Sequence, residues 1–470
     1  MIKTKEEFIK ICSDQKFWQW INNKSYIPYE KITDKEIFLT NIYKKIAART
    51  YYPKPPKEYL SLNKGHGVVR IIPSFQLEDL CVYYYCVRKL ERFIAVNHVP
   101  GTYGGFGIHG ELRRIEEDEI KNIKNQYRVV SLGDKSYVFS DGGYMLSSMN
   151  SDAWKMNWGD FNSKLYFNCN SKDEKFEYAT ELDISNFYDS IQLDNLEYKI
   201  RKYVKNNLND VVYLLMHFLR FWNRHVNFYR QQGAGIPQDA FGECSRIIAN
   251  FYLQDYDKEI SSYCKKKGCN YFRYADDQII FTHNKSEAIE IVSKASSLLM
   301  REGLNFNQKK VNIMSIKLFK KYFCFDNFFA LKPNKNGDID RNVLNKQIKF
   351  YLKNRILLRK KGLSLFRRIL SVLINCPRKP SNFLLLKKLI ISEEFLLNNP
   401  LNADDLAKIY SILRPIERKK FIKFLDIEIS SCLYSDRLYN LYFFYKKIKI
   451  NVGKIRRSIS RTKKFYNLVT

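Results

Sequence analysis

Long apolar runs, paired cysteines and acidic side chains are scarce in this sequence of 470 residues. Because no apolar stretch approaches the ~20 residues needed to span a bilayer, we expect no membrane contact. The N-terminus also lacks the apolar core and small-residue cleavage site of a signal peptide. The ten cysteines include no Cys-x-x-Cys pair of zinc-site spacing, so they are predicted to be reduced packing groups. These absences favour a cytoplasmic protein.

Acidic residues are outnumbered by 80 Lys and Arg to 49 Asp and Glu, which leaves a formal charge of +31. Residues 341–470 hold 30 basic and eight acidic side chains, a net charge of +22. A field of this sign attracts polyanions, so nucleic acid is the predicted partner. The alternative is a Lys-rich composition from an AT-biased genome, which explains the abundance of Lys better than its uneven distribution.

The length and pattern of the chain predict an α+β protein of two or three packed units. Residues 1–60 show helical spacing and form a predicted N-terminal extension, which a cluster of prolines ends. Residues 61–330 alternate short β-rich runs with helical stretches, as expected for a sheet covered by helices. Residues 331–470 are basic and read as helical almost throughout.

The sharpest local signal is Tyr274-Ala275-Asp276-Asp277, which lies between two aromatic and aliphatic runs. This pattern predicts a strand-turn-strand hairpin with two carboxylates at its tip. Adjacent carboxylates repel each other, and a bound divalent cation would relieve that repulsion. An ordinary Asp-rich turn is the alternative reading of the hairpin alone.

A second acidic position favours the metal reading, because residues 177–183 form a predicted strand that ends at Asp183. Alternation along the strand leaves Glu181 and Asp183 on one face. Placed beside the hairpin, Asp183 would complete a cluster of three carboxylates that can hold two hard cations. Such a pair can activate a 3′-hydroxyl and neutralise leaving pyrophosphate, which is the two-metal chemistry of nucleotidyl transfer.

Together these motifs resemble the reverse transcriptase family, and the resemblance spans residues 60–330. Gly235-Ile236-Pro237-Gln238 is similar to the family's Gly-x-Pro-Gln turn, residues 245–253 to the palm helix that follows it, and residues 303–310 to the Gly-Leu-x-Asn-x-x-Lys segment. The implied fold is a right-hand polymerase with fingers, an antiparallel palm sheet and an all-α thumb or appendage.

The resemblance also implies roles for individual residues. Catalysis would use Asp183, Asp276 and Asp277, which with the backbone of Ile184 would hold two Mg²⁺, or Mn²⁺ in their place. The residues implied in nucleotide binding are Lys64, Arg70, Phe187, Tyr188, Gln238 and Lys310. Those implied near the template or primer are Pro237, Asp239, Ser245, Arg246 and Tyr274.

Two of these roles have a specific physical basis and a plainer alternative. Tyr188 falls at the family's steric gate, which excludes a ribose 2′-hydroxyl and selects dNTPs, although it could also be a core residue. Lys64, Arg70 and Lys310 would bind phosphates through charge-assisted hydrogen bonds, or they could be ordinary solvated charges.

Two segments depart from simple patterns. Asp239 stands where the family usually has Gly after Pro-Gln, which puts conventional template handling in question. Residues 100–107 are rich in Gly but lack the Gly-Lys-Ser/Thr of a P-loop, so they are predicted to form a fingers loop.

The altered turn, the single core and the basic tail resemble the defence-associated bacterial reverse transcriptases called unknown groups. Within these groups, the Tyr-Gly-Gly segment is similar to the second polymerase of the type 3 two-polymerase system. The resemblance implies antiphage activity with RNA and DNA, including a noncoding RNA, and a second reverse transcriptase subunit or a higher oligomer. Three alternatives remain open: a template-independent or protein-primed deoxynucleotidyl transferase, a non-catalytic RNA-binding scaffold and an RNA-dependent RNA polymerase.

Overall fold

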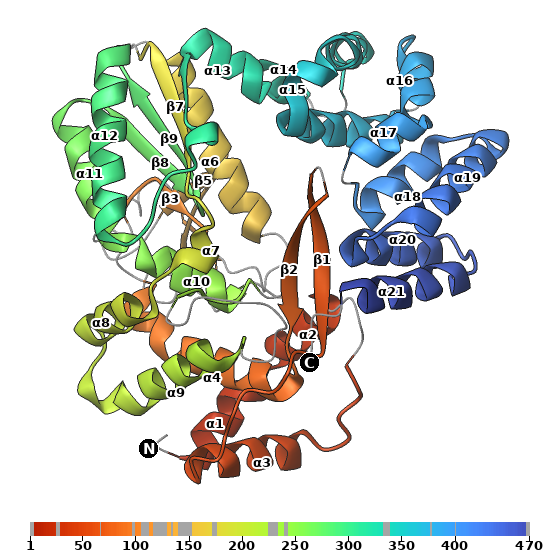
Figure 1. Ribbon diagram of the computed structural model, residues 1–470. Helices are drawn as coiled ribbons and strands as arrows, with labels where there is room; N and C mark the ends of the chain where they lie inside the picture. Colours follow the sequence, from red (N-terminus) through yellow and green to blue (C-terminus); the bar gives the residue numbers. More distant parts are fainter. Residues whose placement is uncertain are drawn as a thin grey trace. The chain divides into compact units, whose positions relative to one another are not determined.

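The protein was analysed as a computed structural model (Figure 1), which describes residues 4–24, 29–65, 67–95, 99–104, 112–115, 129–132, 135–139, 153–171, 176–223, 234–238, 243–331, 339–376, 378–399 and 401–466. The chain divides into two compact units. The first contains described residues of 1–59 and 72–316, and the second those of 60–71 and 317–468. Each unit is described by itself.

The N-terminal segment is helical, as its spacing predicts, with α1 at Lys5–Cys12, α2 at Gln15–Lys24 and α3 at Lys35–Ala47. The side chains of Thr4 and Asp34 accept backbone hydrogen bonds at the starts of α1 and α3 and thereby cap these helices. The apolar faces pack on α4 (Leu77–Ile94), where Phe17 stacks on Tyr84 with ring centroids 4.1 Å apart. The N-terminal helices therefore share the hydrophobic core of the first unit.

One buried carboxyl group makes the stability of this core depend on pH. Asp79 is fully buried on α4, where it accepts hydrogen bonds from the Tyr51 hydroxyl (2.7 Å) and the Lys54 N–H (3.0 Å). Burial raises the pKa of Asp79 to about 6. Because an unfolded Asp has a pKa of about 3.9, the folded chain binds more protons between about pH 4 and 6. The free energy of unfolding should therefore fall as the pH rises through this window.

The decrease in the free energy of unfolding between about pH 4 and 6 should be on the order of 2 kcal/mol. Asp79→Asn is expected to abolish this pH dependence. The measurement is urea unfolding of both proteins at about pH 4 and about pH 7. An equal pH dependence in the two proteins would contradict the raised pKa.

A five-stranded sheet forms the centre of the first unit, in the order β10-β7-β9-β8-β3. Its strands are β3 (Thr102–Tyr103), β7 (Tyr178–Asp183), β8 (Asn270–Tyr274), β9 (Asp277–Thr282) and β10 (Asn312–Ser315). Neighbours are antiparallel except β3, which runs parallel to β8. The expected sheet covered by helices is confirmed, and β3 makes it a mixed sheet.

The same strand corrects one expectation, because residues 100–107 were predicted to form a fingers loop. The described part of that segment instead contributes β3 to the edge of the central sheet. The prediction was wrong because only two residues pair, too few for a recognisable strand pattern in the sequence.

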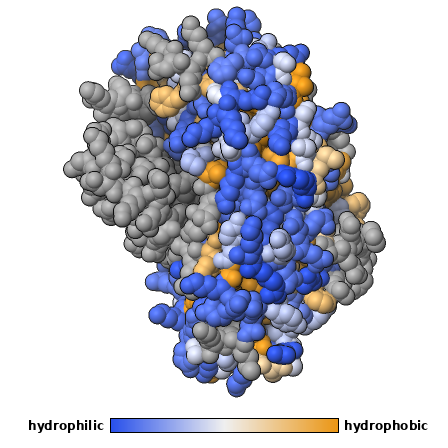
Figure 2. Space-filling model, turned by 90° about the vertical axis from the view of Figure 1, so that its left-hand side faces the viewer, coloured by the Kyte–Doolittle hydropathy of each residue, from blue (hydrophilic) through white to orange (hydrophobic). Residues whose placement is uncertain are grey.

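Helices lie on both sides of this sheet (Figure 1). α11 (Gln254–Lys266) and α12 (Lys285–Arg301) cover one face, and α6 (Ala153–Asn170) packs near β3 and β8. Figure 2 views the side on which α11 and α12 lie in Figure 1, and this side is mostly hydrophilic with small separate hydrophobic patches. The buried residues of α12 are Ala288, Ile291, Ala295, Leu298 and Leu299, and those of α11 include Tyr256, Ile260 and Cys264, so both helices bury an apolar side.

The remaining elements of the first unit lie around this sheet and α4. The helices are α7 (Phe187–Ser190), α8 (Leu193–Tyr203), α9 (Asn209–Phe221) and α10 (Glu243–Tyr252). A separate antiparallel sheet has the order β4-β6-β5, with β4 at Leu112–Ile115, β5 at Val129–Leu132 and β6 at Lys135–Phe139. α10 begins close to the start of the predicted palm helix and so confirms that helix.

The second unit combines a β-hairpin with helices. The hairpin strands are β1 (Glu58–Gly65) and β2 (Val68–Ser74), of which residues 60–71 belong to this unit. The helices are α13 (Ile316–Phe323), α14 (Phe325–Ala330), α15 (Arg341–Asn375), α16 (Phe383–Ile390), α17 (Glu393–Asn398), α18 (Ala403–Ile412), α19 (Pro415–Ser431), α20 (Ser435–Lys447) and α21 (Gly453–Tyr466). Reciprocal hydrogen bonds of 2.8 and 2.9 Å between Ser61 and Ser435 join the hairpin to α20.

The basic charge of the C-terminal region lies on exposed helix faces. In α21, Ile455 and Ile459 are buried. The basic side chains of this helix are exposed: Lys454, Arg456, Arg457, Arg461, Lys463 and Lys464. The region predicted at residues 331–470 to be basic and helical consists mainly of helices over its described part, and its boundary stays a prediction.

All ten cysteines are free thiols and eight of them are buried, which confirms that they mostly serve as packing groups. In the described part of the chain, no helix is long and apolar enough to cross a bilayer.

Candidate active site

The predicted carboxylate hairpin forms as the sequence indicates. β8 and β9 pair in register, with Tyr274 opposite Asp277, and Ala275 and Asp276 make the two-residue turn between them. Ala275 has a φ of +54°, a left-handed conformation that costs an alanine energy and is common at tight hairpin turns. The turn places the half-buried Asp276 and Asp277 at the end of the sheet.

Asp183 lies directly opposite Asp277, at the end of the neighbouring strand β7. The Asp183 carbonyl accepts a 2.8 Å hydrogen bond from the Asn307 N–H, on the side of β7 away from β9. The Asp183–Asp277 pair is therefore of the non-hydrogen-bonded kind, in which side chains on one face approach most closely. Two carboxylates that are far apart in the sequence thus share one face of the sheet, next to the turn that holds Asp276.

The carbonyl group of Ile184 is directed toward β9, the strand that begins with Asp277. Ile184 forms an isolated antiparallel bridge with Phe306. The Ser185 N–H donates to the Asn305 carbonyl (2.8 Å) in this bridge, so Ile184 does not use its own backbone groups there. Because alternate residues of a strand direct their backbone groups to opposite sides, the Ile184 carbonyl is directed toward β9.

Lys310 lies at the same site, where its Nζ is 2.8 Å from Asp183 Oδ1. Asp183 is 8% exposed, whereas the Lys310 side chain is 58% exposed. The ion pair therefore has a buried acidic side and a solvated basic side, so Lys310 can turn to solvent or a phosphate, whereas Asp183 needs another cation in its place. The structure thus places Lys310 beside Asp183, and its role at the incoming triphosphate stays a prediction.

The donor set fits a hard divalent cation such as Mg²⁺, because it consists of carboxylate and carbonyl oxygens. Among the described residues, one set of three metal-ligating side chains has all its ligand atoms within 4.8 Å of one another, and it lies elsewhere, at Cys269, His283 and Glu287. The three aspartates do not form so tight a set, and Asp183 instead pairs with Lys310. Binding of metal by Oδ1 of Asp183 would require this oxygen to exchange Lys310 for the ion.

A buried arginine supports the turn from inside the sheet. Arg273 is fully buried, and its Nη1 donates a 2.7 Å hydrogen bond to the Ala275 carbonyl. Its Nε lies 2.8 Å from Asp257 Oδ1, and its Nη2 contacts the other oxygen of Asp257 on α11. Burial lowers the pKa of Arg273, but the Asp257 carboxylate more than offsets this and holds it above the ordinary value. Arg273 is therefore a charged positioning residue that holds the Ala275 carbonyl, one residue before Asp276.

Two glycines let β3 approach the hairpin closely. The Arg273 N–H donates to the Gly101 carbonyl (3.0 Å) and the Ala275 N–H to the Tyr103 carbonyl (3.1 Å). Gly101 and Gly104 have φ values of +88° and +86°. A Cβ on Gly101 would lie 2.9 Å from the Tyr271 carbonyl, and one on Gly104 would lie 3.3 Å from the Ala275 nitrogen. The Gly-rich segment thus braces the turn, a role that its sequence alone does not indicate.

Some residues predicted to bind the nucleotide or to lie near the template gather beside the turn. Phe187, Tyr188 and Arg246 line a cavity of about 10 Å³ together with Ala275. The Tyr188 carbonyl accepts a 2.9 Å hydrogen bond from the Ile236 N–H, which places the turn that carries Pro237 and Gln238 beside it. Pro237 is buried and Gln238 is half-buried. The structure therefore brings Tyr188, Arg246 and this turn to the hairpin.

Other predicted residues lie differently. Ser245 is fully buried and its hydroxyl lies 2.8 Å from the Tyr83 hydroxyl, so it can act on a template only through α10. Tyr274 is half-buried edge-on against Trp158, with ring centroids 4.9 Å apart. Asp239 lies outside the described residues. Lys64 and Arg70 lie on the hairpin of the second unit, and their role stays a prediction.

A family model described as reverse transcriptase (RNA-dependent DNA polymerase) matches residues 112–351, just over half of the chain. The chain belongs to the reverse transcriptase family. The matched part of this reverse transcriptase contains the three aspartates, Tyr188 and Lys310, whereas Lys64 and Arg70 precede it. The central sheet with its carboxylate hairpin is accordingly the palm, and the α+β fold class is confirmed.

The comparison with curated proteins gives retron Ec83 reverse transcriptase from Escherichia coli, 32% identical over 201 residues. The similarity covers 37% of this chain and 61% of that protein, so the chain spans about three fifths of the length of this relative. Among solved structures, apo telomerase from Candida tropicalis has a TM-score of 0.29 and 13% identity, covering 63% of this chain and 55% of that chain. Telomerase from the same organism in complex with a fragment of telomeric RNA has a TM-score of 0.34 and 11% identity, covering 92% and 69%. Family membership rests on the family model.

Proposed function

We propose that the protein is an RNA-directed DNA polymerase that transfers deoxynucleotides to a 3′-hydroxyl by two-metal catalysis. The observation that carries this proposal is the register that sets Asp183 opposite Asp277, beside the turn that presents Asp276. Family membership supports the same reaction class.

Each part of the site has a task in this reaction. Asp183, Asp276 and Asp277, with the Ile184 carbonyl, would hold two Mg²⁺, for which Mn²⁺ can substitute. When bound, these ions lower the barrier by activating the primer 3′-hydroxyl and neutralising charge on the leaving pyrophosphate. Lys310 leaves Asp183 and pairs with a phosphate of the dNTP, since an exposed lysine is mobile enough to do so. Lys64 and Arg70 would bind the β- and γ-phosphates.

Tyr188 is proposed to exclude ribonucleotides, because its ring occupies the wall of the small cavity beside the turn. Tyr188→Ala is expected to raise rNTP use relative to dNTP use at least about tenfold, since it removes the steric clash with a 2′-hydroxyl. The measurement is the ratio of kcat/KM for a matched rNTP and dNTP. Tyr198→Ala, which changes a tyrosine 69% exposed on α8, is the control and should leave the ratio unchanged. An unchanged ratio in Tyr188→Ala would contradict the gate.

The wider role is proposed to be antiphage defence in the bacterial cytoplasm. The exposed basic faces of the second unit would bind RNA and DNA, including a noncoding RNA, through phosphate contacts. The proposed partners also include a second reverse transcriptase subunit or further copies of this chain in a higher oligomer. Loss of phage protection in cells that carry Asp276→Asn with Asp277→Asn tests whether defence requires the polymerase site.

Templated synthesis is tested by supplying the purified protein with a primed RNA of defined sequence and each dNTP singly. The proposal predicts that only the dNTP complementary to the next template base is added, and that a changed template base changes the dNTP. Addition of the same dNTP to every template would favour a template-independent transferase. A preference for rNTPs over dNTPs would contradict the assignment as a DNA polymerase.

A further inference from the structure

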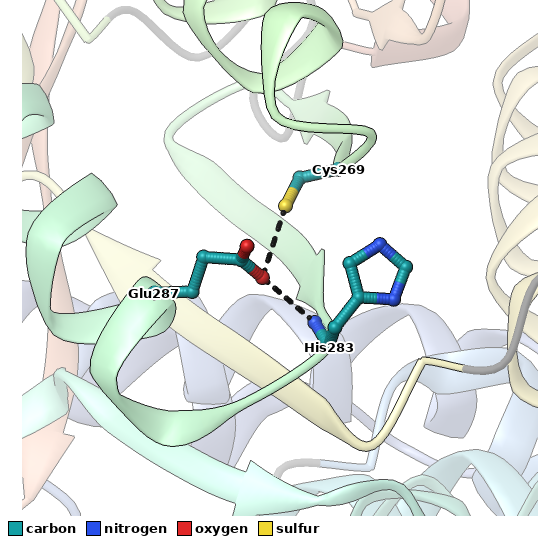
Figure 3. Close-up of side chains that lie close together, drawn as sticks. All are labelled: Cys269, His283 and Glu287. Carbon is teal, nitrogen blue, oxygen red and sulfur yellow. Dashed lines mark hydrogen bonds between the residues drawn. The ribbon is translucent and has the colours of Figure 1, made fainter.

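A second group of metal-ligating side chains lies at the other end of the palm hairpin. Cys269 directly precedes β8, His283 directly follows β9, and Glu287 lies in the first turn of α12. One ligand atom of each lies within 4.8 Å of the other two. Figure 3 shows the Glu287 carboxylate between the Cys269 thiol and the backbone of His283. Three elements therefore bring a sulfur, an imidazole nitrogen and a carboxylate oxygen to one place.

The spacing suits a small tetrahedral ion. Zinc binds sulfur at about 2.3 Å and nitrogen or oxygen at about 2.0 to 2.2 Å, which sets a sulfur and an oxygen ligand about 3.5 Å apart. Cys269 Sγ and Glu287 Oε2 are 3.5 Å apart. The imidazole needs to approach by no more than about 1.5 Å, since tetrahedral nitrogen and oxygen ligands lie about 3.3 Å apart.

Backbone groups contact two of the three side chains. The Glu287 carboxylate accepts a 3.0 Å hydrogen bond from the His283 N–H, and the Asn284 side chain caps α12 through the Glu287 N–H (2.9 Å). The His283 Nε2 lies 3.2 Å from the Gly268 carbonyl. Figure 3 shows the other ring nitrogen directed away from Cys269 and Glu287, so a metal ion would be bound through Nε2, in place of its contact with the Gly268 carbonyl.

The thiol is the ligand that discriminates between cations. Cys269 is 3% exposed, so its sulfur faces the protein interior beside the Glu287 carboxylate. Mg²⁺ and Ca²⁺ prefer oxygen ligands, whereas zinc accepts this mixture of sulfur, nitrogen and oxygen.

We propose that Cys269, His283 and Glu287 bind one Zn²⁺, with water as the fourth ligand. The ion would join the start of β8 to the end of β9 and to α12, so it would fasten the open end of the hairpin whose turn carries Asp276 and Asp277. Its role is structural, because the two sites occupy opposite ends of the same strands. The proposal does not depend on the polymerase activity.

Cobalt titration of the full chain, after removal of metal with a chelator, tests this site directly. Co²⁺ replaces Zn²⁺ and gives a charge-transfer band when it binds a thiolate, so the band does not report the oxygen ligands of the aspartates. We expect one equivalent of Co²⁺ to produce the band and Zn²⁺ to abolish it, because zinc binds such sites more tightly. His283→Gln and Glu287→Gln should each weaken Co²⁺ binding at least about tenfold, since even outer contacts of a metal ligand are worth that much.

Cys269→Ser should lose the band, and Cys264→Ser is the matched control because Cys264 is also buried nearby but outside the ligand set. Zn²⁺ should raise the melting temperature of the unmodified protein and not that of Cys269→Ser. If Cys269→Ser does not fold, the two glutamine variants decide the question. The absence of a band in the unmodified protein, or its loss in Cys264→Ser alone, would overturn the proposal.

Discussion

Replacing Asp276 and Asp277 by Asn is expected to lower the rate of dNTP incorporation at least about 1000-fold, or about 4 kcal/mol of barrier. The amide groups keep the size of the side chains but remove the charge that would hold the metal ions. Because the turn is set by the Ala275 backbone and by Arg273, the fold should survive the change. The measurement is single-turnover primer extension, with thermal unfolding to confirm that the variant is folded.

A matched control uses the same chemical change at a solvent-exposed position. The Asp194 side chain on α8 is 88% exposed and pairs with Arg220 at the surface. Asp194→Asn should extend primers as the unmodified protein does. A folded Asp276→Asn, Asp277→Asn protein that retains full biological effect would instead favour the RNA-binding scaffold.

Asp257→Ala is expected to destabilise the first unit by about 3–5 kcal/mol, because it leaves the Arg273 guanidinium buried without its counter-charge. Asp257 is 1% exposed and Arg273 is fully buried, so water cannot replace the lost carboxylate. The Tyr271 hydroxyl also loses its 2.8 Å hydrogen bond to Asp257. The free energy of unfolding in urea measures this effect.

Asp255 is the control on the same helix. Its side chain is 32% exposed and lies 3.3 Å from Lys199, which keeps a second partner in Glu302 at 2.8 Å. Asp255→Ala should therefore cost about 1 kcal/mol or less. Equal losses of stability in Asp255→Ala and Asp257→Ala would show that the buried pair carries no special weight.

The palm could be predicted from the sequence because its signals are local. Aromatic and aliphatic runs on both sides of Asp276 and Asp277 specify the hairpin, and alternation places Asp183 on the polar face of its strand. The register between β7 and β9 then places Asp183 opposite Asp277, so the two motifs form one site. The N-terminal and C-terminal helices were predictable for the same reason, since their apolar spacing is continuous.

Contacts between distant elements could not be predicted. Arg273 reads as one polar residue in a strand, and its partner Asp257 is defined only when α11 covers that face of the sheet. Cys269, His283 and Glu287 do not have the spacing of a cysteine-pair zinc motif, so the sequence pattern does not indicate them. The hairpin register was the available signal: Asn270 pairs with Phe281, so Cys269 and His283 flank the strand ends.

The roles of residues that lie outside the palm motifs remain predictions. Lys64 and Arg70 lie on a hairpin whose residues 60–71 belong to the second unit, so their link to the catalytic carboxylates rests on the family resemblance. The division at residues 60 and 330 and the similarity to the second polymerase of a two-polymerase system likewise remain predictions.

The most direct test of the central claim is anomalous scattering from Mn²⁺ in crystals of the protein with a primed template and a non-hydrolysable dNTP. The account predicts two Mn²⁺ peaks bound by Asp183, Asp276 and Asp277, with Lys310 displaced from Asp183. Mn²⁺ bound elsewhere, with Asp183 still paired to Lys310 in the presence of the nucleotide, would contradict it.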